Sequence, residues 1–141
     1  MKWRSTVVIL FCCSALLTVL SLQSEKLYVS MGGKKYALDV SENEPARQKG
    51  LGERNSMQLD EGMLFVFDKA EMQCFWMKDM RFSIDIIWLD EAKRVVHIEP
   101  NVSPDTFPQS FCPKAPAKYV IELNSGETAK SSINIGNQIR F

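Results

Sequence analysis

The chain has 141 residues, with 17 basic and 17 acidic side chains and a formal net charge of zero. This length fits one domain. Lysine and arginine are spread along the chain rather than gathered in a patch, which argues against nucleic acid as a partner. The same spread offers no polybasic segment for anionic lipids.

The first 22 residues predict export or membrane anchoring. Lys2 and Arg4 precede residues 6–22, which carry no charge. This run is slightly long for the apolar part of a signal peptide and short for a membrane-spanning helix. We interpret residues 1–22 as an N-terminal apolar helix, either an uncleaved anchor to the membrane or an inefficiently cleaved signal. Residues 23–141 are then a single extracytoplasmic domain, in the periplasm or at the cell surface.

The first half of this domain predicts a hairpin, a helix and a buried strand. Apolar and polar residues alternate over 27–31 and 36–40, with Gly32-Gly33 between them, which is typical of a β-hairpin. Residues 41–50 predict a short helix that Ser41 or Asn43 can cap, with Pro45 in its first turn. The apolar run 63–67 predicts a buried strand. Residues 68–73 are expected to form a loop.

The second half predicts further short strands. We expect strands over 74–82, 84–89, 94–98 and 118–123, and two more near the C-terminus around a turn at 136–137. Residues 99–117 contain five prolines, so they predict a long irregular loop of the kind that often carries function. One or two helical turns are expected within 127–132. Together these signals predict a mainly β fold, a compact barrel-like or sandwich domain with one or two short helices.

Two cysteines, Cys74 and Cys112, belong to the predicted domain. In an oxidising compartment they can form one disulfide, which would close a loop of about 38 residues and contribute roughly 3–4 kcal/mol. Their spacing does not show that the side chains meet, so two free thiols remain the alternative.

Several motifs in order resemble one known family. They include EPARQKGL at 44–51, GMLFVF at 62–67, FWMK at 75–78, DII at 85–87 and YVIEL at 119–123. The region from about residue 36 to 141 resembles the small prokaryotic family called domain of unknown function 192. The resemblance implies a small, mainly β, barrel-like domain that often follows a signal or anchor, and it implies no mechanism. Asp79-Met80 stands where the family usually has Asn-Thr, and Ser83 where it usually has proline.

Ionisable residues within apolar strands are the first candidates for a site. Lys78 beside Trp76 can hold an anionic group while the ring stacks on a sugar or an apolar ligand. The alternative is a structural ion pair of Lys78 with Asp85 or Glu122. The ligand-binding candidates are Phe75, Trp76, Lys78, Asp85, Glu122 and Arg54.

Metal and catalytic sites have weaker signals. Thioether and thiol groups at 72, 74, 77 and 80 resemble a Cu(I) site, but strand alternation divides them between two faces. We therefore expect no metal and no cofactor. Cys112 with His97 is the Cys/His combination that nucleophilic catalysis would need, although no local motif joins them.

The sequence favours a non-catalytic ligand- or partner-binding module of the cell envelope. Residues 75–78 and the loop 99–117 are the predicted contact surface, and the ligand or envelope partner is not identified by the sequence. One alternative is a small envelope hydrolase or thiol enzyme that uses Cys112. Another is a purely structural envelope protein whose unusual residues all serve the core.

Overall fold

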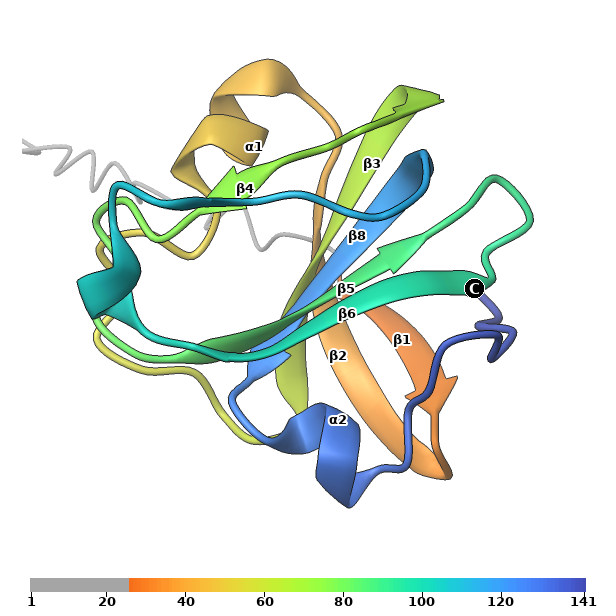
Figure 1. Ribbon diagram of the computed structural model, residues 1–141. Helices are drawn as coiled ribbons and strands as arrows, with labels where there is room; N and C mark the ends of the chain where they lie inside the picture. Colours follow the sequence, from red (N-terminus) through yellow and green to blue (C-terminus); the bar gives the residue numbers. More distant parts are fainter. Residues whose placement is uncertain (1–25) are drawn as a thin grey trace, which may run out of the picture.

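The computed structural model describes residues 26–141 (Figure 1). The predicted apolar helix of residues 1–22 lies outside the described residues. Within residues 26–141, no helix is long and apolar enough to cross a membrane.

Six strands form one mixed sheet in the order β1-β2-β3-β8-β5-β6. Neighbouring strands are antiparallel except β2 and β3, which run parallel. A second sheet contains only β4 and β7. The predicted mainly β class is therefore confirmed, but the sheet is open, with β1 and β6 at its edges, rather than a closed barrel or a sandwich of equal sheets. The strands are β1 (Lys26–Met31), β2 (Lys34–Ser41), β3 (Glu61–Glu71), β4 (Phe75–Trp76), β5 (Ile84–Leu89), β6 (Val95–Val102), β7 (Ser110–Phe111) and β8 (Ala117–Asn124).

Two short α-helices lie at opposite ends of the sheet, as Figure 1 shows. They are α1 (Glu44–Lys49) and α2 (Glu127–Lys130). Asn43 caps α1 by accepting a hydrogen bond from the Ala46 amide at 3.0 Å, and Pro45 stands in the first turn. Gly50 ends the helix with a φ of 49°, a conformation that glycine adopts without a steric penalty. The predicted short helices are confirmed.

Several predicted boundaries differ from the structure because pairing partners lie far away in the sequence. β3 continues to Glu71, since that residue pairs with Ala117 beyond an irregularity in the ladder. The strand predicted over 74–82 is reduced to β4, because only β7 is available to pair with it. The loop 99–117 contains the end of β6, a short 3-10 helix (Pro104–Thr106) and β7. Instead of two C-terminal strands, isolated bridges join Arg140 to Ser30 and Gln138 to Arg94.

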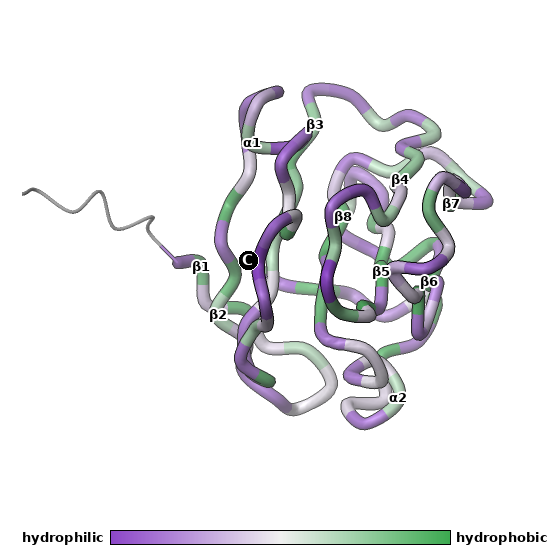
Figure 2. The backbone as a smooth tube through the Cα atoms, turned by 90° about the vertical axis from the view of Figure 1, so that its left-hand side faces the viewer, coloured by the Kyte–Doolittle hydropathy of each residue, from purple (hydrophilic) through white to green (hydrophobic). Residues whose placement is uncertain are grey.

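Apolar side chains cover both faces of the sheet and form two clusters. Alternating residues of β8 divide between them, because successive side chains of a strand point to opposite faces. Ile121 and Leu123 join the first cluster with β1, β2 and residues of the C-terminal segment. Val120 joins the second cluster with Phe65 and Trp88. Figure 2 shows the resulting alternation of hydrophobic and hydrophilic residues along the strands.

The β4–β7 pair covers the second cluster and is held by a disulfide. Cys74 directly precedes β4, Cys112 directly follows β7, and the two are bonded, with their Cα atoms 4.2 Å apart. The Phe75 ring packs edge-on against Phe65 and Trp88, with centroids 4.9 and 6.1 Å apart, a favourable aromatic geometry. This small layer is therefore fixed both covalently and by packing.

Replacing both cysteines by serine is expected to lower the free energy of unfolding by roughly 3–4 kcal/mol, because the unfolded chain regains the entropy of a loop spanning 38 residues. Urea unfolding of the purified domain, before and after treatment with reductant, measures this loss. The reductant should have no effect on the double variant. An unfolding midpoint that is the same for the native protein and the double variant would contradict the assignment.

Candidate functional site

A cavity of about 580 Å³ lies on the face of the sheet that carries β4. Its volume is within the range of small-molecule pockets. Four of the six candidates from the sequence line it: Phe75, Trp76, Lys78 and Glu122. The remaining lining residues come from α1 and the turn after it (Glu44, Arg47, Gln48, Lys49, Gly50, Leu51, Gly52), from β3 (Phe65, Phe67, Asp68, Lys69, Glu71), and from the segments around β4 (Gln73, Cys74, Met80).

Four aromatic side chains form part of the cavity wall, among a larger number of polar and charged lining residues. Phe65 and Phe67 come from one face of β3 and both pack edge-on against Phe75. Trp76 points outward and is 53% exposed. The centre of its ring lies 5.8 Å from the centre of the Phe107 ring. The Lys78 ammonium lies 6.0 Å from the centre of the Trp76 ring. Trp76 is thus an exposed aromatic surface at the edge of the cavity.

Glu122 also lines the cavity, from the middle of the sheet. It stands on β8 between Met63 of β3 and Ile86 of β5. The residue is only 5% exposed, and its Oε2 atom is enclosed without a hydrogen-bond partner. Burial raises the pKa of this carboxyl to about 8, and the positive charge of Arg54 opposes the shift only in part. At neutral pH Glu122 is therefore mainly an uncharged acid.

The two nearby arginines are engaged through their terminal nitrogens, whereas the Nε atom of Arg47 is buried without a hydrogen-bond partner. Arg54 donates toward Asp39 across 3.0 Å and borders a separate, shallower hollow beside Met63. Arg47 donates to the backbone carbonyls of Glu42 and Val66 and to a carboxylate oxygen of Glu44. These interactions hold both guanidinium groups at the rim. Of the six candidates, Arg54 therefore lies next to the cavity but outside its lining.

Asp85, another candidate, serves the architecture and does not line the cavity. It is fully buried and accepts four hydrogen bonds, from the amides of Asn101, Gly126 and Thr128 and from the Thr128 hydroxyl, at 2.6–3.0 Å. These bonds fix the end of β6 and the start of α2. Within residues 26–141 Lys78 forms an ion pair with neither Asp85 nor Glu122, so the structural pair considered from the sequence is not formed.

The structure gives no support to the thiol enzyme. The sulfur of Cys112 is bonded to Cys74, and a disulfide sulfur cannot act as a thiolate nucleophile. His97 is buried against the Trp88 ring at 5.3 Å, with Glu99 3.6 Å away. This histidine therefore has a packing role.

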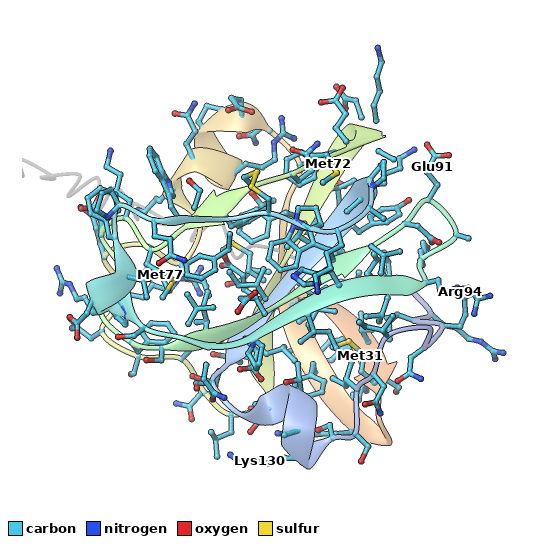
Figure 3. All side chains as sticks on the ribbon, viewed as in Figure 1. Met31, Met72, Met77, Glu91, Arg94 and Lys130 are labelled. Atoms are coloured by element: carbon cyan, nitrogen blue, oxygen red, sulfur yellow. A yellow bond between two sulfur atoms is a disulfide. The ribbon has the colours of Figure 1, made fainter. Side chains whose placement is uncertain are left out.

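Soft metal ligands are also dispersed. Met72 is 51% exposed, whereas Met77 is 2% exposed, and Figure 3 shows the two far apart. In the part of the chain that the structure describes, no three histidine, cysteine, aspartate or glutamate side chains are grouped to hold a metal ion.

Most lining residues were not candidates from the sequence, and two of them, Phe67 and Arg47, show why. Phe67 shares a strand face with Phe65, so strand alternation could have placed both together. Arg47 lies within the EPARQKGL motif, but its position depends on the Val66 carbonyl, which is 19 residues away. That contact has no signal in the local sequence.

The fold and the cavity define a class of small domain, an open mixed sheet with a disulfide-held second layer and a pocket beside it. The chain belongs to the DUF192 family, described only as an "Uncharacterized ACR", whose sequence pattern matches residues 27–141. This confirms the resemblance that the motifs suggested.

Two crystal structures share the fold. A "putative transcription regulator" from Sinorhizobium meliloti is 23% identical with a TM-score of 0.75, covering 82% of this chain and 92% of that one. A protein of unknown function from Novosphingobium aromaticivorans is 24% identical with a TM-score of 0.73, covering 82% and 84%. No curated protein matches the chain.

The raised pKa of Glu122 predicts that stability falls as pH rises. The unfolded chain loses this proton near pH 4.5 and the native protein only near pH 8, so the native state binds more protons between these values. The stabilisation is complete below about pH 4.5 and is lost as pH approaches 8, by roughly 5 kcal/mol in total. Urea unfolding across this interval measures the slope.

Glu122→Gln should remove this part of the pH dependence, whereas Glu71→Gln, at an exposed carboxylate of the same cavity, should retain it. Parallel stability curves for native protein and Glu122→Gln would contradict the assignment.

Proposed function

We propose that this domain is a non-catalytic ligand-binding module of the cell envelope, and that the cavity over Glu122 is its binding site. One observation carries the proposal. A buried carboxyl with an unpartnered oxygen lies in the lining of a cavity whose wall includes four aromatic rings, and buried polar groups in proteins are almost always satisfied.

The position of Glu122 favours binding over a purely structural role. Both of its cross-strand neighbours, Met63 and Ile86, are apolar and buried. An apolar residue there would pack without the desolvation penalty that an acid incurs. Native proteins retain such locally unfavourable residues mainly at functional sites. A ligand that bonds to the carboxyl would offset the penalty in the complex.

The exposed aromatic pair supports a contact surface at the mouth of the cavity. Trp76 follows Phe75 in β4, and Phe107 belongs to the proline-containing segment between β6 and β7. The centres of the two rings are 5.8 Å apart. The segments 75–78 and 99–117, which the sequence predicts as a contact surface, therefore lie next to each other here. Single exposed apolar residues are ordinary, but a tryptophan that also lines a cavity offers a stacking surface for a ligand.

Placement in the envelope rests on two features. Residues 1–22 have the charge and hydropathy of a signal or anchor. The Cys74–Cys112 disulfide is of the kind that persists in oxidising compartments. The membrane is then a partner through residues 1–22, and the binding domain faces the extracytoplasmic space.

A transcriptional role is less well supported. The description of the Sinorhizobium meliloti protein refers to that protein, and a likeness at 23% identity shows the fold alone. Equal numbers of basic and acidic residues give this chain no electrostatic attraction to nucleic acid.

The proposed site predicts that Trp76→Ala impairs binding without unfolding the domain. A screen of small amines, sugars and carboxylates by thermal shift should reveal compounds that stabilise the native protein. The variant should bind them roughly tenfold more weakly, because it loses a stacking surface. Tyr28→Ala is the matched control, since Tyr28 is 63% exposed and lies outside the cavity.

The proposal fails if every stabilising compound acts equally on native protein and Trp76→Ala. Chemical conversion of a bound compound by the native protein would instead support an enzyme.

A further inference from the structure

The unpartnered carboxyl also indicates what kind of ligand the cavity takes. We propose that the cavity binds an organic ammonium ion, with its cationic group paired to Glu122 and its hydrocarbon part against the aromatic side chains of the lining. This inference rests on the proposed function.

The first argument is the missing partner of Glu122. Oε2 is enclosed and accepts no hydrogen bond, and a buried carboxylate is stable only when it is paired. The terminal nitrogens of Arg47 and Arg54 are held by other acceptors, and the remaining donor of Arg47, its buried Nε, forms no hydrogen bond with Glu122. The Lys78 ammonium lies over the outward-pointing Trp76 ring. A cation supplied by a ligand would complete the pair that the chain leaves open.

The second argument is the nature of the walls. The faces of aromatic rings attract cations, and aromatic pockets are a recurring means of binding ammonium groups. Two rings of this cavity already have a cation of the chain over them, Arg47 over Phe67 at 5.1 Å and Lys78 over Trp76 at 6.0 Å. The Phe75 ring, by contrast, has no cation over it within residues 26–141. An ammonium ligand would meet this ring and the Glu122 counter-charge, whereas a neutral alcohol would gain less from either.

The third consideration is the charge around the cavity, which becomes balanced when Glu122 ionises. Four basic and three acidic side chains line it besides Glu122, and an ionised Glu122 makes the numbers equal. An anionic ligand would lie beside an uncharged Glu122 at neutral pH and would be repelled by its carboxylate above about pH 8, so probes of both charges are needed to decide between the two signs. The charged groups of the lining are Glu44, Arg47 and Lys49 of α1, Asp68, Lys69 and Glu71 of β3, and Lys78 after β4. Arg54 lies outside the lining, but its positive charge also acts on Glu122.

Binding of an ammonium ion has a defined proton balance. Glu122 is protonated in the free protein near neutral pH because burial raises its pKa. When the ammonium ion binds, the O–H bond of the carboxyl breaks, the proton passes to solvent, and the carboxylate pairs with the cation. One proton is therefore released for each ligand bound. At pH values below the pKa of free Glu122, affinity should then rise about tenfold for each unit by which the pH is raised.

Three probes of the same shape and different charge test this assignment: benzylammonium, benzyl alcohol and benzoate. Binding is followed by NMR, from shifts of backbone and indole N–H resonances around the cavity. Benzylammonium should bind most tightly, with an affinity that rises about tenfold between pH 6 and pH 7. Glu122→Gln should lose both the preference and the pH dependence. Glu91→Gln, at an exposed acid outside the cavity, should keep both.

The possible outcomes distinguish a failure of the ammonium assignment from a failure of the proposed function. If benzyl alcohol or benzoate binds the cavity as tightly as benzylammonium, the ammonium assignment is wrong and the binding module stands. If none of the probes shifts these resonances, the ammonium assignment also fails, while the wider screen with Trp76→Ala still decides the proposed function. Should Glu122→Gln not fold, the pH dependence of benzylammonium binding to native protein decides alone, and a flat profile overturns the proposal.

Discussion

The structure depends on the need to cover a sheet whose central strands are apolar on both faces. All six residues of β5 are buried, so side chains on both of its faces must be kept from water. On one face, β1, β2 and the C-terminal segment contribute to a shared cluster, and that segment bridges to Ser30 of β1 and to Arg94 just before β6. On the other face, the cover is the small β4–β7 layer, too short to be stable by strand pairing alone and therefore bonded through Cys74 and Cys112.

The cavity follows from the small size of this second cover. Beside it, α1 and the outer half of β3 form the remaining walls, and the surface of the sheet between them carries Glu122 in place of an apolar residue. The acid is enclosed enough to have its pKa raised, yet it lines a space large enough for a small molecule. Packing, desolvation and the proposed binding thus meet at one position of β8, where stability is lower than an apolar residue would give.

The parts of this account that local sequence could predict are those that local interactions determine. The run 84–89 forms β5 at the predicted bounds, Asn43 caps α1, and strand alternation correctly separates outward Trp76 from inward Met77. The sequence could not show that Asp85 accepts hydrogen bonds from backbone amides up to 43 residues away. Nor could it show that Arg54 turns to Asp39 and leaves Glu122 unpaired. The open sheet likewise depends on the long-range order of its strands, which periodicity does not encode.

The central claim is that Glu122 is an acid held uncharged in the lining of the cavity, and its own titration tests this most directly. The chemical shift of its carboxyl carbon, followed by NMR in ¹³C-labelled protein and assigned by its loss in Glu122→Gln, reports ionisation at this single residue. The account predicts a midpoint near pH 8. A midpoint near 4.5, the usual value for glutamate, would show that the carboxyl is solvated or paired in solution and would contradict the account.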